Sequence, residues 1–382
     1  MDVRLSDEQQ LLRRSVREFA EAELRPHVME WDQAQQFPAA VLTRLANLGL
    51  MGMQFPEEYG GAAMSAVDYC LCLEELARVD PSICLSVAAH NGLGAAHIFK
   101  FGTEAQKRRY LVPLAEGRQL AAWALTEAAS GSDAAAMQTT AVREGDDWVL
   151  SGTKQFITHG RGGDVMVVMA VTSRAKGSRG ISAFIVERGT PGLRAGRKED
   201  KLGMRASETS EVIFDACRVP ARQLLGVEGQ GFVNALQVLD AGRIGIAALA
   251  VGLAQGAYEA ARAHAFERRQ FGRPIGTFQA VRAKLVDAAL RIEGARLLTR
   301  RAAVMQDEGQ RTTLEAAMAK LYSSEMAVRV AEDGVQLHGG YGFVKDYPAE
   351  KYFRDVKLTT IGEGTSEIQR LVIARQLLAG LS

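Results

Sequence analysis

The chain has 382 residues, of which 47% are hydrophobic and 24% are charged. This is the composition of a soluble globular protein and excludes bulk disorder, and the length predicts two or three domains. The formal net charge of +1 excludes the basic excess that is typical of nucleic-acid-binding proteins.

The N-terminal sequence Met1–Glu8 is acidic and lacks the apolar core of a signal peptide. The longest uncharged stretch, residues 244–258, is rich in Ala and Gly. It is shorter than the about 20 apolar residues that span a membrane, so we expect a buried helix there. The four cysteines have no C-x-x-C spacing and do not form a disulfide framework. We therefore expect a cytoplasmic protein with no membrane partner.

Residues 1–118 are expected to form an α-helical domain. Ser6–Gln9 and Thr103–Gln106 are capping-box patterns, in which a hydroxyl and a Gln side chain satisfy free N–H groups at a helix start. Apolar residues follow the first pattern at helical spacing, as at Leu12 and Val16.

Residues 119–230 are expected to form a β-rich domain. Val165–Val171, Ile181–Val186 and Glu211–Phe214 are apolar segments of strand length, separated by Gly, Pro, Asp and Ser. No long helical period interrupts them, which argues against a β-α-β array.

Residues 231–382 return to a helical pattern. The segments 244–268, 278–306 and 313–337 contain few helix breakers, and a fourth helix is expected after Ser366. These lengths predict a bundle. The predicted fold class is therefore α+β, with a helical, a β-rich and a second helical domain in that order.

The common catalytic signatures are absent. The sequence has no G-x-G-x-x-G after a strand, no Walker A motif, no H-E-x-x-H and no G-x-S-x-G. Its six histidines are scattered, and His90 and His97 lack a third ligand. We expect no metal site, and nicotinamide Rossmann enzymes, kinases, zinc hydrolases and serine hydrolases are disfavoured.

Three segments are unusual. Residues 124–133 concentrate small and hydroxyl side chains, which permit close approach to a flat ligand or phosphate, although a domain-joining loop is the ordinary interpretation. Residues 336–343 place three glycines within four positions at a helix end, more than a helix cap requires. Residues 361–370 place Glu363 between two glycines, before a capping box predicted at Ser366–Gln369. Such a carboxylate suits a general base, and an exposed loop glutamate is the alternative.

Together these segments resemble the signatures of the acyl-CoA dehydrogenase family. Residues 124–133 match A-L-T-E-x-x-x-G-S-D, residues 336–342 match Q-x-x-G-G-x-G, and residues 363–370 match E-G-T-S-E-I-Q-R. Glu267–Ile275 is similar to the family's E-R-x-x-F-G-x-x-[IL] segment. The resemblance covers essentially the whole chain, in the expected order.

The resemblance implies an N-terminal α-helical domain, a β-barrel-like middle domain and a C-terminal four-helix bundle. It implies FAD bound without a Rossmann motif, and a homotetramer built as a dimer of dimers in which each FAD touches two subunits. The implied reaction converts an acyl-CoA to the trans-2-enoyl-CoA. Glu363 takes the α-proton, the β-hydrogen leaves as hydride to flavin N5, and electrons pass to an electron-transferring flavoprotein.

The resemblance also assigns site residues. The FAD of the same subunit is expected to contact Trp123, Leu125, Thr126, Gly131, Ser132, Phe156, Ile157, Thr158, Thr365 and Glu367. The FAD of the neighbouring subunit is expected to contact Arg268, Gln279, Gln336, Gly339 and Gly340. The acyl-CoA is expected to contact Ser132, Asp240, Arg243 and Gly364.

The sequence departs from the family pattern at three positions. Phe156 stands where many relatives have Trp, Ala128 where Pro is usual, and Gly362 where a larger residue is common. Gly362 leaves room beside the base, so a branched acyl chain stays open, as do glutaryl and aryl substrates. Branched- and long-chain relatives can instead place the base at the position of Gly242, which favours a short-to-medium, butyryl-type substrate here.

Two other functions are weighed against this one. Acyl-CoA oxidases pass electrons to oxygen and are usually longer, which favours the dehydrogenase. A non-catalytic or DNA-associated flavoprotein of the same fold is expected to lack the base or to add a basic region, and this sequence keeps Glu363 with a net charge of +1.

Overall fold

Helices form the N-terminal part of the chain in the computed structural model, which describes residues 4–379. They are α1 (Asp7–Phe19), α2 (Val28–Ala34), α3 (Ala39–Asn47), α4 (Ala66–Val79), α5 (Pro81–Ala89), α6 (Ala96–Phe101), α7 (Glu104–Gln106) and α8 (Val112–Ala115). The capping boxes predicted at Ser6 and Thr103 are confirmed, because these hydroxyls accept hydrogen bonds from the N–H groups of Gln9 and Gln106.

One mixed sheet forms the middle of the chain. Its strands are β1 (Ala121–Ala124), β2 (Thr140–Glu144), β3 (Asp147–Thr158), β4 (Val165–Val171), β5 (Ile181–Glu187), β6 (Leu193–Lys198), β7 (Thr209–Pro220) and β8 (Leu224–Leu225). The strand order is β6-β7-β3-β2-β4-β5-β8, and β1 pairs in parallel with β4. The strands predicted within β4, β5 and β7 are confirmed, whereas β1, β2, β3, β6 and β8 were not identified from the sequence.

The sheet curls, because side chains on strands that are not neighbours share one apolar cluster. Met166 and Val168 on β4 pack in a cluster with residues of β3, β5 and β7, including Trp148 and Phe184, whose rings lie 5.3 Å apart. Val167 on the opposite face packs with a second cluster that includes helical residues. Every residue of β4 is buried, which explains its continuous apolar sequence.

Long helices form the C-terminal part. They are α9 (Gly231–Glu267), α10 (Gln279–Asp307), α11 (Thr313–His338), α12 (Ala349–Asp355) and α13 (Ser366–Leu377), with a small hairpin of β9 (Arg269–Gln270) and β10 (Arg273–Pro274) after α9. Helix α9 begins at Gly231 rather than at residue 244, because Asp240 and Arg243 interrupt the apolar pattern without breaking the helix. It is long and apolar enough to cross a membrane, but 72% of its most apolar window is buried inside the protein, as in a core helix.

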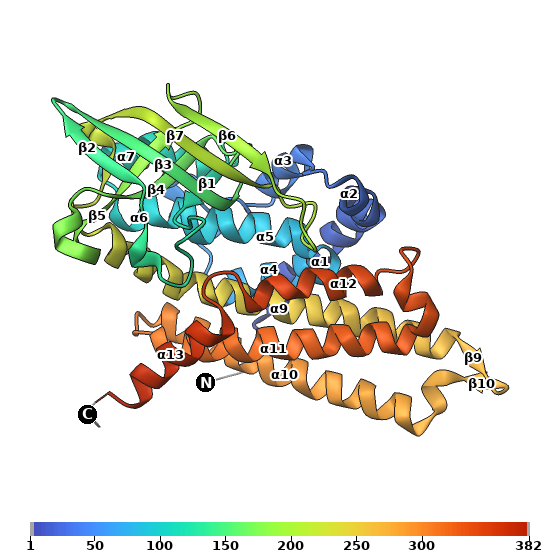
Figure 1. Ribbon diagram of the computed structural model, residues 1–382. Coiled ribbons are helices and arrows are strands. Elements are labelled where there is room, and N and C mark those ends of the chain that lie inside the picture. Colours follow the sequence, from blue (N-terminus) through green and yellow to red (C-terminus); the bar gives the residue numbers. More distant parts are fainter. Residues whose placement is uncertain (1–3, 380–382) are drawn as a thin grey trace.

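Figure 1 shows the sheet and the hairpin β9–β10 at opposite ends of the molecule, with helix α9 running between them. Helix α9 packs against α10 and α11, and also against α4 of the N-terminal part. The predicted order of helical, β-rich and helical parts is confirmed. The domain limits 1–118, 119–230 and 231–382 remain predictions, and residues 1–3 and 380–382, including the start of the N-terminal segment 1–8, lie outside the described residues.

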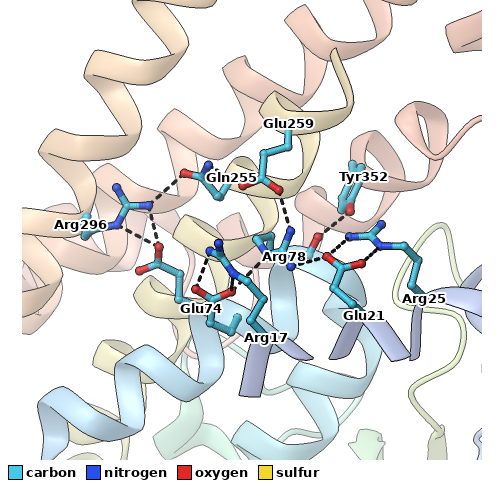
Figure 2. Close-up of polar contacts among 10 residues, drawn as sticks. Arg17, Glu21, Arg25, Glu74, Arg78, Gln255, Glu259, Arg296 and Tyr352 are labelled. Carbon is cyan, nitrogen blue, oxygen red and sulfur yellow. Dashed lines mark hydrogen bonds and ion pairs between the residues drawn. The ribbon is translucent and has the colours of Figure 1, made fainter. Parts of the chain in front are cut away.

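Arginines and glutamates tie the N-terminal helices to the bundle (Figure 2). Arg78 on α4 donates to Glu75, to Glu259 on α9 at 2.7 Å, and to Glu21 of the turn that follows α1. Arg17 on α1 also donates to Glu75, at 2.8 and 2.9 Å. The Arg78 side chain is buried, yet each of its nitrogens has a carboxylate partner.

Candidate active site

Glu363 lies in the turn that precedes helix α13. Glu363 and Gly364 both have positive φ angles, 53° and 94°, which glycine adopts readily and glutamate rarely. Thr365 caps α13, since its hydroxyl accepts a hydrogen bond from the N–H of Ile368 at 3.3 Å. Ser366, which the sequence pattern predicted as the cap, is instead the first residue of the helix, so that prediction is wrong by one residue.

The carboxylate of Glu363 is enclosed by protein. Its Oε2 atom is buried and has no hydrogen-bond partner among the described residues, although other atoms of the residue are partly exposed. Burial raises the pKa of Glu363 to about 7, while the positive charges of Lys320 and Arg243 limit the rise. A carboxylate that titrates near neutrality can accept a proton and release it again.

Gly242 on α9 lies against this carboxylate. A β-carbon at Gly242 would be 2.3 Å from Oε2 of Glu363 and 3.4 Å from Cδ2 of Leu93. Any side chain at position 242 would therefore displace the carboxylate. Glu363 and position 242, where some relatives are expected to place the base, are neighbours in space, and glycine at position 242 makes room for the glutamate.

Asp240 and Arg243 lie one turn apart on the same helix. Arg243 is 4% exposed, and its Nη1 donates to Oδ1 of Asp240 at 2.5 Å. The other carboxylate oxygen of Asp240 accepts from the hydroxyl of Thr313 at 2.9 Å. The structure thus places both predicted substrate contacts beside Gly242, and the charge of Arg243 acts on Glu363.

A second group of predicted residues lies on the middle sheet. The N–H of Gln155 donates to the carbonyl of Thr126 at 2.9 Å and joins β3 to the segment that follows β1. The pairing of β3 with β7 shifts register between Lys154 and Ile157. Within this bulge Phe156 has a φ of 59° and is 60% exposed, while Ile157 is buried. An aromatic side chain exposed at a bulge offers a surface on which a flat ring can stack.

A buried ion pair supports this surface. Nζ of Lys154 donates to Oε1 of Glu127 at 2.8 Å and to the carbonyl of Leu125 at 2.9 Å. Glu127 also accepts hydrogen bonds from the N–H groups of Gln138 and Thr139. Because both charged groups are satisfied inside the protein, the pair holds Leu125–Glu127 in one conformation.

Trp123 on β1 is held by a histidine. Its Nε1 donates to Nδ1 of His97 at 3.0 Å, and burial lowers the pKa of His97 to about 3. His97 is therefore neutral and accepts this bond at ordinary pH. Gly131 and Ser132, in contrast, are exposed in the loop that follows.

A third group lies at the far end of the bundle, next to the hairpin β9–β10 (Figure 1). A cavity of about 840 Å³ there is lined by four predicted residues: Arg268, Gln336, Gly339 and Gly340. Its wall also contains the rings of His264 and His338, which stack at 4.4 Å, and Tyr341, whose ring lies 5.4 Å from the guanidinium of Arg268. Gln279, the first residue of α10, is not among the lining residues.

The predicted residues therefore form three clusters rather than one. Glu363 and Gly364 lie in the turn before α13, and Asp240 and Arg243 lie on α9 on either side of Gly242, which is next to the Glu363 carboxylate. Thr365 and Glu367 lie beside them at the start of α13, where hydrogen bonds to the carboxylate lower the pKa of the exposed Glu367. The cluster on the middle sheet and the cluster beside the hairpin β9–β10 lie at opposite ends of the molecule (Figure 1).

Sequence reasoning did not identify three residues near these clusters, Lys154, Tyr69 and Lys320, and it weighed His97 only as a metal ligand. Lys320 carried a usable signal, because it is a lysine on a helical face otherwise made of Ala316, Ser323 and Ser324, all buried. A lysine at such a position is buried only when something inside the protein holds its charge.

Three family models match the chain in succession. They are the N-terminal domain of acyl-CoA dehydrogenase over residues 6–118, the middle domain over residues 122–217 and the C-terminal domain over residues 229–378. The chain belongs to the acyl-CoA dehydrogenase family. The predicted family and enzyme class, an oxidoreductase of the acyl-CoA dehydrogenase type, are thereby confirmed.

Individual relatives are similar over almost their whole length. The short-chain specific acyl-CoA dehydrogenase of Clostridium acetobutylicum is 46% identical over 99% of this chain and 100% of its own. The solved butyryl-CoA dehydrogenase of Megasphaera elsdenii has 43% identity and a TM-score of 0.97, covering 99% of this chain and 100% of its own. A chain from a structure of the electron-transferring flavoprotein of Acidaminococcus fermentans has 46% identity and a TM-score of 0.98, with the same coverage.

Proposed function

We propose that this acyl-CoA dehydrogenase binds FAD and converts a short- or medium-chain acyl-CoA to the trans-2-enoyl-CoA, with Glu363 as the base. The observation that carries the proposal is the enclosed carboxylate of Glu363, whose Oε2 has no partner among the described residues. An oxygen that is buried and unpartnered is free to accept a proton from a bound ligand. The pKa of about 7 means that Glu363 ionises near neutral pH, as a working base requires.

Glu363, Arg243 and Gly364 are proposed to have different roles around that oxygen. The α-proton of the acyl group passes to the Glu363 carboxylate, which becomes neutral in its enclosed position. The buried guanidinium of Arg243, held by Asp240, is positioned to donate hydrogen bonds to carbonyl oxygens of the CoA pantetheine arm. Gly364, with a φ of 94°, lets the chain turn tightly directly after the base.

The residues on the middle sheet fit a flavin. Phe156 offers an exposed ring, and Leu125 and Thr126 are held beside it by Lys154 and Gln155. Exposed Gly131 and Ser132 leave backbone and hydroxyl groups accessible to phosphate. FAD bound there would supply the two-electron acceptor for the hydrogen that leaves the β-carbon.

The cluster at the far end suits the FAD of a neighbouring subunit. Arg268 supplies a positive charge for pyrophosphate. A β-carbon at Gly339 or Gly340 would have no neighbouring atom within 4 Å, so the backbone there faces open space. The cavity and the sheet lie at opposite ends of the molecule, so we propose that one FAD contacts the sheet of one subunit and the cavity of another (Figure 1). This arrangement requires at least two subunits. The homotetramer, in which Gln279 and Gln336 also contact the neighbour's FAD, is proposed from the family resemblance.

Electrons are proposed to pass to an electron-transferring flavoprotein. The support is the similarity to the chain found in the structure of the Acidaminococcus fermentans flavoprotein. A cytoplasmic location remains the proposal from the sequence, and the four cysteines, which are buried and free, are compatible with a reducing compartment.

Tyr69 supports the short end of the substrate range. A β-carbon at Gly245, one turn along α9 from Gly242, would lie 3.0 Å from the Tyr69 hydroxyl, and one at Gly92 would lie 3.2 Å from it. Burial and the negative charge of Glu363 raise the pKa of Tyr69, so the phenol is neutral and near the base. We propose that this ring limits the length of the acyl chain that fits beyond Glu363.

An anaerobic titration tests the function. Purified protein that contains FAD is mixed with butyryl-, isovaleryl-, glutaryl-, octanoyl- and palmitoyl-CoA while flavin absorbance is followed. Bleaching by butyryl-CoA in preference to palmitoyl-CoA is expected, and Tyr69→Ala should shift the preference to octanoyl-CoA whereas Tyr69→Phe should not. Flavin that none of these reduces, or protein that cannot bind FAD, would contradict the proposal.

A further inference from the structure

Lys320 stands apart from the other fully buried lysines. The side chains of Lys154, Lys320 and Lys351 are at most 2% exposed. Lys154 is paired with Glu127, and Lys351 is paired with Asp80 and Asp355. No carboxylate lies within 4 Å of the Lys320 ammonium in the part of the chain that the structure describes. A buried cation without a paired anion is unfavourable, so its retention needs an explanation.

The only hydrogen-bond acceptor of Lys320 among the described residues is the backbone beside the base. Its Nζ donates to the carbonyl of Gly364 at 2.6 Å, reaching from α11 to the turn before α13. The amide of Gln369 donates to the same carbonyl at 2.9 Å and to the carbonyl of Glu363 at 3.2 Å. Lys320 and Gln369 together hold two successive residues with positive φ, one of which is a glutamate that rarely adopts this conformation.

Lys320 also acts on the carboxylate. The groups that act on Glu363 are Lys320 from α11 and Arg243 from α9, with the neutral phenol of Tyr69 on α4 nearby. The groups that act on Lys320 are Glu363, Arg243 and Glu367. The charge of Arg243 is offset by Asp240 at 2.5 Å, so Lys320 is the cation beside Glu363 whose charge no adjacent carboxylate offsets.

We infer that Lys320 is a positioning residue for the base: it holds the Glu363–Gly364 backbone and keeps the Glu363 carboxylate ionised before substrate binds. This inference rests on the proposed role of Glu363. Burial alone favours the neutral, inactive acid, and a nearby ammonium favours the carboxylate. Burial lowers the pKa of Lys320 to about 8, so it is still mostly protonated at neutral pH.

Two substitutions separate the roles. Lys320→Met removes the charge and the donor, while Lys320→Gln removes the charge and keeps a donor. Lys320→Arg keeps the charge and should rescue the pH profile. Lys357→Met is the matched control, because Lys357 is an exposed lysine six positions before Glu363 in the chain.

The measurement is the rate of flavin reduction by butyryl-CoA from pH 5.5 to 9.5 with FAD content held equal. We expect both neutral variants to be about tenfold slower at pH 7, because the pKa of the base rises. The loss in Lys320→Gln should disappear at high pH, whereas Lys320→Met, which also lacks the donor, should keep a smaller loss there. Lys320→Arg and Lys357→Met should keep the pH profile of the parent. A loss by the same factor at every pH, or an unchanged profile in both neutral variants, would overturn the inference.

A second readout does not depend on turnover. The protonated carboxyl band of Glu363 is followed by infrared difference spectroscopy, with the same variant carrying Glu363→Gln as the reference. The band should persist to higher pH in Lys320→Gln than in the parent, and an unchanged titration would contradict the role of Lys320. If the parent reduces no acyl-CoA, the proposed function fails, whereas an active parent with an unchanged titration contradicts only the role of Lys320.

Discussion

In the network of Figure 2, each side-chain nitrogen of the buried Arg78 contacts a carboxylate. The candidate active site differs: among the described residues, neither the ammonium of Lys320 nor the carboxylate of Glu363 has an opposite charge within 4 Å. The pKa values of two glutamates show the effect of having or lacking a charged partner. Hydrogen bonds from Arg25, reinforced by Arg78, lower the pKa of Glu21 to about 2. Burial raises the pKa of Glu363 to about 7. Paired charges hold helices together, and an unpaired carboxylate remains able to exchange a proton.

The largest effect on stability is expected in the ion-pair network around Arg78. Arg78→Met leaves Glu21, Glu75 and Glu259 without their shared partner. Removing one member of a buried ion pair destabilises a protein by about 4 kcal/mol. We expect the first unfolding transition in denaturant to move to lower concentration, while the rate of flavin reduction per folded enzyme stays within twofold. A normal transition with reduced activity would contradict the separation of the two regions.

The unpaired carboxylate should destabilise the protein as pH rises. The pKa of Glu363 is about 7 in the folded protein against an ordinary value of 4.5, so its stabilising contribution is complete below pH 4.5 and is lost as pH rises through 7. Glu363→Gln removes this dependence. Its stability relative to the parent should therefore increase from pH 4.5 to 8 by roughly 3 kcal/mol. Thermal unfolding across this range measures it, and a constant difference would show that the folded pKa is not raised.

The next prediction concerns the space beside the Glu363 carboxylate, which Gly242 leaves open because it has no side chain. A methyl group at this position would be 2.3 Å from Oε2 of Glu363. Because the flexible carboxylate can move aside, Gly242→Ala should fold normally but misplace the base, and a misplacement of about 1 Å lowers rates about 100-fold. Rapid-mixing kinetics with FAD content as the control tests this, and full activity would mean that the carboxylate acts from another position.

The smallest effect is expected on the exposed face of the helix that carries Lys320. Arg329 and Glu332 form an ion pair there with both side chains more than half exposed. Such pairs contribute at most about 0.5 kcal/mol. Arg329→Met should therefore change neither the unfolding transition nor the pH profile measurably. A large effect would show that the exposed charges of α11 matter as much as the buried charge of Lys320.

The family and the candidate base Glu363 could both be predicted from the sequence, because short local motifs identify them. Sequence reasoning placed the strands β4 and β5, whose side chains are apolar on both faces except for Ser182 and Glu187. It missed β3, where polar residues such as Lys154 and Gln155 lie within the strand. The burial of Lys154 depends on Glu127 and that of Lys320 on Gly364, and such contacts between distant segments leave no periodic pattern in a sequence.

The role of Glu363 is tested most directly by mixing butyryl-CoA with parent and Glu363→Gln proteins that hold equal amounts of FAD, without oxygen. Glutamine keeps the shape of the side chain but cannot accept the α-proton. The parent flavin should bleach rapidly, and the variant should remain yellow with a rate at least about 1,000-fold lower. A variant that is reduced as fast as the parent would contradict the assignment of Glu363 as the base.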